Sequence, residues 1–198
     1  MCGIVGVVGL DDCAETLLDS LKRLEYRGYD SSGIVTHTGT TFSMTRAVGK
    51  LGALSAALRE TPLQGRSGLG HTRWATHGGV SERNAHPHIA DQKVAIVHNG
   101  IIENHAKLRA ELEDKGHKFA SETDSEVLAH LFLACFDSGM DARRAGAHVL
   151  SQIEGTFAFS AMHVDQPDVL IVGRNASPPA LSIGAGTSFA GSASGALA

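Results

Sequence analysis

Hydrophobic runs of strand length occur in both halves of the chain. They are "GIVGVVG" (3–9), "SSGIVTHT" (31–38), "TFSMTRA" (41–47), "KVAIVHN" (93–99), "TFAFSAMHV" (156–164) and "DVLIVGR" (168–174). Gly39 and Thr40 separate the second run from the third and favour a hairpin there. The last two runs predict a second strand pair across "DQP".

Helical spacing of apolar residues predicts helices over 14–26, 50–60, 103–116, 123–136 and 142–155. Thr123 and Glu126 form the pattern of a capping box. Asp141 is expected to begin the last helix and Gly155 to end it, while Gly116 ends the third. Two hairpin-built sheets with helices gathered between them suggest a layered α/β sandwich, although the periodicity alone fits other α+β arrangements as well.

Two segments give weaker signals. The glycine-bounded segment "GRSGLGHTRWATHGG" (65–79) predicts a loop with room for one strand. The tail "GAGTSFAGSASGALA" is rich in small residues and resembles a domain edge.

Composition limits the classes of protein and the compartment. The 198 residues suit a single domain, with 42% hydrophobic and 19% charged residues. A formal net charge of -4 indicates no nucleic-acid partner. The sequence holds neither an apolar stretch long enough for a membrane span nor a secretion signal. Three cysteines without CxxC spacing indicate reduced thiols and a cytoplasmic protein.

Cys2 is the first candidate for chemistry. Methionine is commonly removed when the second residue is small, which would give Cys2 a thiol and a free α-amine. Their unperturbed pKa values, about 8.5 and about 7.7–8.0, suit proton transfer between them. Cys2 would then act as a nucleophile without a histidine base. The alternative is a small buried residue at the start of a strand.

A thiolate that attacks an amide or ester needs an oxyanion hole. Asn99 and Gly100 offer a side-chain amide and a backbone N–H at the end of an apolar strand. A type I′ hairpin at Asn-Gly is the alternative. Helical spacing resumes two residues later, which favours a strand end over a hairpin.

Charged residues that could bind an α-amino acid lie in two other segments. The Arg73 guanidinium could bind a carboxylate bidentately, and Asp124, in the first turn of a predicted helix, could bind an ammonium group. Trp74, Thr76 and His77 lie between glycines that would let a lid close. A single surface ion pair for Arg73 and a helix-dipole role for Asp124 remain open.

A metal site receives little support. His86 and His88 in "NAHPH" have no obvious third ligand. The glycine-rich segments have no Walker lysine and no dinucleotide fingerprint.

Several motifs together resemble the glutaminase domain of the glutamine–fructose-6-phosphate aminotransferase family, which are class II glutamine amidotransferases. The motifs are "MCGIVG" at the start, "LEYRGYDSSG" (24–33), "GHTRWATHG" (70–78), "NAHPH" (84–88), "HNGIIEN" (98–104) and "SETDSE" (121–126). This resemblance extends from residue 2 to about 175 and implies one type-2 glutamine amidotransferase domain over 1–198. It also implies an α+β fold, the four-layer αββα sandwich of the N-terminal nucleophile (Ntn) hydrolases, with two antiparallel sheets between helical layers.

The same resemblance implies a role for each candidate residue. By it Cys2 attacks the side-chain amide of L-glutamine, and glutamate and ammonia form through a γ-glutamyl thioester without a cofactor. Asn99 and Gly100 would form the oxyanion hole. The residues for substrate binding would be Arg73, Trp74, Thr76, His77 and Asp124. Arg27 would lie near the amino end of the nucleophile, with a helix-ending role as the alternative, and His86 near the site.

The resemblance also suggests partners. In the family, ammonia converts fructose 6-phosphate to glucosamine 6-phosphate in sugar-isomerase domains, which this chain lacks, and the full-length enzyme is expected to be a homodimer. A glutaminase that serves another acceptor enzyme and a non-catalytic glutamine-sensing module remain alternatives. Val80, Pro179 and Ala193 depart from the family pattern, the first in the predicted lid and the others in the tail.

Overall fold

The structure is a computed structural model that describes residues 2–176, 180–184 and 187–192. Among these residues, ten strands form two sheets of antiparallel pairs. The strands are β1 (Gly3–Val8), β2 (Ser31–His37), β3 (Phe42–Val48), β4 (Ser67–Arg73), β5 (His88–Ala90), β6 (Val94–Ile102), β7 (Gly155–His163), β8 (Ile171–Asn175), β9 (Ala180–Gly184) and β10 (Thr187–Gly191). The six-stranded sheet has the order β3-β2-β4-β1-β10-β9 and the four-stranded sheet the order β5-β6-β7-β8.

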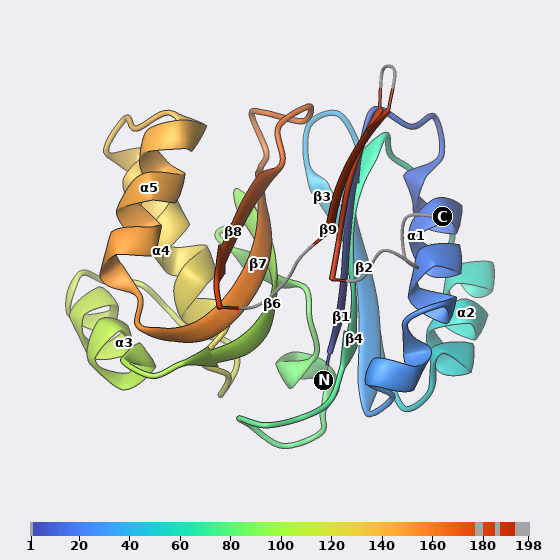
Figure 1. Cartoon of the computed structure of the whole chain (residues 1–198), viewed down its shortest axis with the longest axis horizontal. Helices are drawn as coiled ribbons and strands as arrows, with labels where there is room; N and C mark the ends of the chain where they lie inside the picture. The colour runs from blue at the N-terminus through green and yellow to red at the C-terminus, as the bar shows by residue number, and fades with distance from the viewer. Residues whose placement is uncertain (1, 177–179, 185–186, 193–198) are drawn as a thin grey trace.

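Helices cover the outer face of each sheet, so the molecule has four layers (Figure 1). The six-stranded sheet carries α1 (Cys13–Lys22) and α2 (Leu51–Glu60), and the four-stranded sheet carries α3 (His105–Asp114), α4 (Glu126–Asp137) and α5 (Ala142–Gln152). Two short 3-10 turns span Glu25–Arg27 and Glu82–Asn84. The predicted αββα sandwich is confirmed. The helices lie outside the sheets, not between them as the pattern along the chain suggested.

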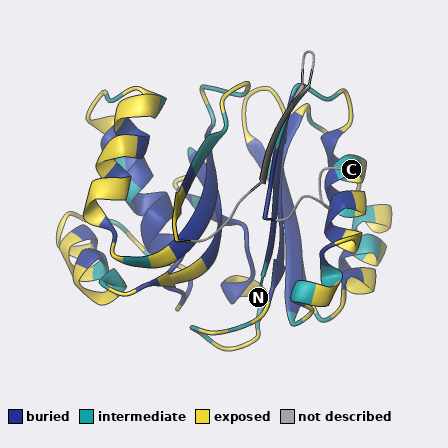
Figure 2. Cartoon of the chain, in the orientation of Figure 1, coloured by how far each residue is buried: buried dark blue, intermediate teal, exposed yellow. Residues whose placement is uncertain are grey.

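Three hydrophobic clusters fill the spaces between the layers. The strands of both sheets are mostly coloured as buried (Figure 2). Strand β1 is buried on both faces, which explains its uninterrupted apolar run. Val5 and Val7 contribute to the cluster under α1 and α2, while Ile4 belongs to the cluster between the two sheets. Side chains of β6 divide in the same way, because alternate residues of a strand point to opposite faces. Val97 contacts the cluster between the sheets and Ile96 the cluster under α3, α4 and α5.

Acidic side chains cap the starts of two helices, and at Asp141 this start is the predicted one. Asp12 accepts a hydrogen bond from the Ala14 N–H at 3.2 Å, and Asp141 accepts one from the Arg144 N–H at 2.8 Å. Helix α5 ends at Gln152, however, three residues before the predicted stop, because Gly155 already belongs to β7.

The capping box predicted at α4 is only half formed. The Glu126 N–H donates to the Thr123 hydroxyl at 3.4 Å, but the Glu126 carboxylate turns to the backbone of Ala120 and Ser121 instead. Helix α4 begins at Glu126, so Asp124 lies before the helix and not in its first turn.

Strand β6 does not end at Asn99 and Gly100 as predicted. It continues to Ile102 and pairs with β7 along its whole length, with Gly100 opposite Phe157. The Asn-Gly pair is therefore neither a hairpin turn nor a strand end. The segment 65–79, predicted as a loop with room for one strand, does contain a strand, the central strand β4. The small-residue tail contributes β9 and β10.

The three departures from the family pattern lie away from the core or outside the described residues. Val80 is half exposed. Pro179 and Ala193 lie outside the described residues. Across the described ranges, no helix has the length and apolar character that a membrane crossing requires.

Candidate active site

Cys2 lies immediately before β1, in the middle of the six-stranded sheet. Its Sγ accepts a hydrogen bond from the Trp74 N–H at 3.1 Å and lies 3.4 Å from the Trp74 carbonyl oxygen. Burial raises the pKa of the Cys2 thiol, while the Trp74 N–H and the positive charge of Arg73 lower it in part. The thiol is therefore mostly protonated near neutral pH and needs a base before it can attack.

Asn99 reaches Cys2 from the opposite sheet. Its side-chain Nδ2 donates to the Cys2 carbonyl oxygen at 2.9 Å, so a hydrogen-bond donor from β6 lies beside Cys2. Gly100, the next residue, has a φ of +110° and lines the cavity next to Cys2. A Cβ at this position would lie 2.1 Å from the Thr156 carbonyl oxygen, so only glycine fits.

Arg73 ends β4 with a buried guanidinium. It donates to the carbonyl oxygens of Gly78 and Gly79, each at 3.2 Å, and to that of His77. Asp124 is also buried, and its Oδ2 accepts from the Ile102 N–H at 2.9 Å. A positive and a negative side chain thus line the same cavity as Cys2.

The segment after Arg73 folds over the cavity. Trp74, Thr76 and His77 all contribute to its lining. Further along the chain, the Asn84 side chain donates to the Gly79 carbonyl oxygen at 3.1 Å. The Arg73 and Asn84 side chains thus both hold the end of this segment at Gly79.

Of the two predicted supporting residues, one lines the cavity. His86 is buried there, with both ring nitrogens lacking a hydrogen-bond partner in the described structure. Arg27 lies in the turn after α1 and donates to the Ser192 carbonyl oxygen at 3.3 Å. Ser192 in turn accepts from the Ile4 N–H, so Arg27 braces the start of β1 and does not belong to the cavity lining.

Two histidines beside the site carry no role in the sequence prediction. His71 lies in β4 and contacts Asn99, and His98 lies in β6 and contacts the Ser125 hydroxyl at 2.7 Å. Both histidines lie inside the sequence motifs quoted above. Their position in predicted strands beside Arg73 and Asn99 is the signal that could have placed them near the site. His88 packs edge to face on His86, and no cluster of three or more possible metal ligands occurs among the described residues.

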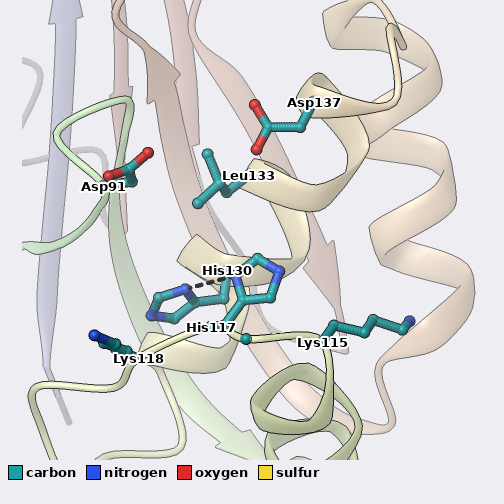
Figure 3. Close-up of a pocket in the computed structure, with 8 residues that line it drawn as sticks. Asp91, Lys115, His117, Lys118, His130, Leu133 and Asp137 are labelled. Carbon is teal, nitrogen blue, oxygen red and sulfur yellow. Dashed lines mark hydrogen bonds between the residues drawn. The ribbon is translucent and has the colours of Figure 1, made fainter.

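The cavity at Cys2 is small, with about 260 Å³ of empty volume, and it collects residues from both sheets. A larger cavity of about 830 Å³ lies elsewhere, beside α4, and its lining includes His117 and His130 (Figure 3). The two cavities share no lining residue. Of these two, the smaller one holds Cys2, the predicted nucleophile, together with Arg73 and Asp124, the charged residues predicted to bind substrate, which makes it the candidate active site.

The fold is that of the Ntn-type glutamine amidotransferases. A solved structure entitled glutamine phosphoribosylpyrophosphate amidotransferase from B. subtilis has a TM-score of 0.83 and 25% identity, and the match covers 99% of this chain and 43% of that one. A second, entitled the allosteric regulatory enzyme of purine biosynthesis, has a TM-score of 0.84 and 26% identity over 99% of this chain and 43% of that one.

The family model described as a glutamine amidotransferase domain matches residues 71–185, and the chain belongs to that family. Among curated proteins, glutamine–fructose-6-phosphate aminotransferase [isomerizing] from Rhizobium meliloti (strain 1021) is 48% identical over 198 residues. The protein of the same name from Mesorhizobium japonicum is 50% identical over the same length. In both cases the chain is covered completely but spans only 32% of the relative. The resemblance inferred from the motifs is confirmed.

Proposed function

We propose that this domain hydrolyses the side-chain amide of L-glutamine to glutamate and ammonia, with Cys2 as the nucleophile. The observation that carries the proposal is the meeting of Cys2, Arg73 and Asp124 around one cavity, with the Asn99 amide bonded to the main chain of Cys2, in a glutamine amidotransferase fold. The chemistry of the family is the transfer of amide nitrogen from glutamine. In the cavity, Cys2 fits the side-chain amide of glutamine, Arg73 its carboxylate and Asp124 its ammonium group.

The α-amine of Cys2 serves as the base once Met1 has been removed. Because burial raises the thiol pKa, the amine has to accept the thiol proton as the sulfur attacks the amide carbon. It then returns this proton to the departing ammonia, which leaves a γ-glutamyl thioester on Cys2. Attack by water on the thioester releases glutamate and restores the thiol.

Asn99 and Gly100 stabilise the negative oxygen of the tetrahedral intermediates. The Asn99 amide already donates to the main chain of Cys2, so it lies within reach of a carbonyl attacked by the same residue. Gly100 lines the cavity and contributes a backbone N–H. Such donors act mainly on the transition state, and losing one typically costs about 10²–10³ in kcat.

Arg73 and Asp124 select an α-amino acid by its charged end. Arg73 takes the substrate carboxylate and Asp124 the ammonium group. In the structure the Arg73 guanidinium holds the backbone carbonyls of His77, Gly78 and Gly79. The same side chain thus couples recognition of the carboxylate to closure of the segment with Trp74, Thr76 and His77. Arg27 braces the strand that starts at the nucleophile, and His86 presents a polar ring to the cavity.

Intact mass measured with and without an electrophilic glutamine analogue tests this proposal, together with glutamate release. We expect a mass without Met1, one adduct per chain and no adduct or activity in Cys2→Ala. Cys135→Ala is the matched control, because Cys135 is buried in the cluster under α4 and should leave labelling unchanged. A folded wild-type protein that is neither labelled nor active would refute the proposal.

We further propose that the ammonia serves the conversion of fructose 6-phosphate to glucosamine 6-phosphate in the cytoplasm. Support comes from the names of the curated relatives, of which this chain spans about a third. The acceptor site would belong to a sugar-isomerase domain, in cis or in trans, and the full-length protein would be a homodimer. No nucleic acid, membrane or cofactor takes part.

Adding a sugar-isomerase domain and fructose 6-phosphate tests the acceptor. Glutamine-dependent formation of glucosamine 6-phosphate is the expected result, with ammonia alone as the product when the partner is omitted. Glutamate release without any aminated sugar would favour another acceptor enzyme. Glutamine binding without glutamate release would favour a sensing module.

A further inference from the structure

His71 lies buried between the two sheets, on the side of Asn99 that faces away from the nucleophile. Its Nε2 is 2.9 Å from the His98 carbonyl oxygen and 3.0 Å from the Asn99 Oδ1. His71 belongs to β4, opposite Ile4 of β1, whereas His98 and Asn99 belong to β6 of the other sheet. This one imidazole therefore ties the sheet that carries Cys2 to the strand that carries Asn99.

The two contacts fix where the proton of the His71 ring lies. Both partners are carbonyl-type oxygens, which can only accept, so Nε2 has to be the protonated nitrogen. Burial lowers the pKa of His71 to about 3, so the ring is neutral near pH 7 and Nδ1 carries no proton. Nδ1 lies buried without a hydrogen-bond partner in the described structure, which fits a bare nitrogen.

The neighbours of His71 hold the ring in this orientation. The His86 ring stacks on it, with the centroids 4.1 Å apart and an angle of 27° between the planes. The side chain is fully buried, and its strand is paired on both sides. A fixed donor on a rigid strand is what is needed to select one of the two orientations of a facing amide.

We infer that His71 is a positioning residue that sets the orientation of the Asn99 amide. With Oδ1 held by His71, the Nδ2 end faces Cys2 and can donate to the oxyanion. If the amide turned over, its NH₂ would face the His71 N–H, and its oxygen would face the developing negative charge. His71 thus makes the productive orientation the only one that leaves both ends of the amide hydrogen-bonded. This inference rests on the proposed glutaminase activity and deepens it.

Replacing His71 by a ring without a donor tests the inference. We expect His71→Phe to lower kcat for glutamine hydrolysis by about 10–100-fold, somewhat less than complete loss of an oxyanion donor. KM for glutamine should change by less than about 3-fold, because the lost interaction acts in the transition state. His71→Gln, whose side-chain amide can donate from nearly the same place as Nε2, should restore most of kcat.

Two further measurements separate positioning from a structural role. In the Asn99→Ala background, His71→Phe should have almost no further effect on kcat, since there is no amide left to orient. Alkylation of Cys2 by iodoacetamide forms no oxyanion, so its rate should stay close to that of the wild type. Should His71→Phe fail to fold, His71→Asn replaces it, because its side chain is too short to reach Asn99.

The possible failures are distinguishable. An active wild type together with unchanged kcat in His71→Phe overturns the positioning role alone. An equally large fall in kcat when His71→Phe is introduced into the wild type and into Asn99→Ala also overturns the positioning role. A wild type that releases no glutamate removes the proposed function and this inference with it.

Discussion

At the scale of single residues, the proposed activity depends on how Cys2 loses its proton. The thiol is buried enough for its pKa to be raised, and the hydrogen bond from the Trp74 N–H offsets this only in part. None of the histidines near the cavity contacts the sulfur in the described hydrogen bonds, and burial lowers the pKa values of His71 and His86. In the proposed mechanism the base is therefore the α-amine of Cys2.

Blocking this amine provides the first prediction. A variant with a lysine inserted between Met1 and Cys2 keeps its initiator methionine and leaves Cys2 with a peptide nitrogen instead of an amine. We expect glutamate release to fall by at least about 100-fold, the lower range for losing a general base. The melting temperature should stay the same. An extended chain that hydrolyses glutamine at the wild-type rate would contradict the mechanism.

The buried carboxylate of Glu126 provides the second prediction, on acid stability. Burial raises its pKa, but hydrogen bonds from the Ser121 hydroxyl and from the Ala120 and Ser121 N–H groups, with the His130 ring 3.7 Å away, outweigh this and lower it. A lowered pKa in the folded state stabilises the protein above the unfolded value of about 4.3. This stability is lost as the pH falls through the lower value of the folded state.

Glu126→Gln should therefore destabilise the protein at pH 7 by about 1–3 kcal/mol. It should also weaken the dependence of stability on pH below about 4. Urea unfolding over a pH series measures both effects. Glu111→Gln, an exposed carboxylate on α3, is the control and should stay within about 0.5 kcal/mol of the wild type. If the stability of Glu126→Gln fell with pH below about 4 as steeply as that of the wild type, another carboxylate would be responsible for the acid dependence.

At the scale of secondary structure, β6 brings the two proposed oxyanion donors to the candidate site, because the strand runs straight through Asn99 and Gly100. Gly100→Ala places a methyl group against the Thr156 carbonyl oxygen in a left-handed backbone conformation. We expect a loss of about 2 kcal/mol or more and, by thermal unfolding, a melting temperature lower by at least about 4 °C. Glutamate release should also fall sharply, because Asn99 shifts with the strand.

Gly52→Ala in α2 is the matched control for that substitution. A Cβ at Gly52 meets open space, and alanine favours a helix more than glycine does. We therefore expect Gly52→Ala to stabilise the protein by about 0.5–1 kcal/mol without any change in kcat. If Gly100→Ala behaved like Gly52→Ala, the strand geometry at Gly100 would be wrong.

Elements with a continuous apolar run and clear turn residues were predictable from the sequence, whereas β4 was predicted only as a strand for which a loop had room. Its glycines give the composition of a loop, yet they are needed for packing. A Cβ at Gly68 would lie 2.5 Å from the Val35 carbonyl oxygen and 2.9 Å from the Leu17 side chain of α1. The close approach of α1 and β2 to this strand is a tertiary contact, which no local pattern records.

The candidate site shows the same limit. Cys2, Arg73 and Asp124 could be singled out because a terminal thiol and opposite charges carry chemistry wherever they lie. His71 could not, because its contact with Asn99 crosses from one sheet to the other over 28 positions in sequence. Asn99 was singled out for its residue type, whereas the continuation of its strand depends on pairing with β7, more than 50 residues away.

At the scale of the whole molecule, the candidate site is divided between the two sheets. Cys2 and Arg73 belong to the six-stranded sheet, and Asn99 and Gly100 belong to the four-stranded sheet. Their relative position is set by the hydrophobic cluster between the sheets, which includes Ile4, Leu69, Val97 and Met162. Packing in this layer should therefore control activity as well as stability.

Two valine substitutions test this division. Val97 lies between the sheets, Val149 lies in α5 and faces the cluster under α3, α4 and α5, and both are fully buried. Val97→Ala and Val149→Ala should each destabilise the protein by about 2 kcal/mol, since each leaves a cavity of similar size. Only Val97→Ala should also lower kcat at a temperature where both variants are folded, because its cavity lets β6 shift relative to Cys2. Urea unfolding combined with glutamate release measures the two effects, and equal kcat values in the two variants would mean that the layer between the sheets does not set the site.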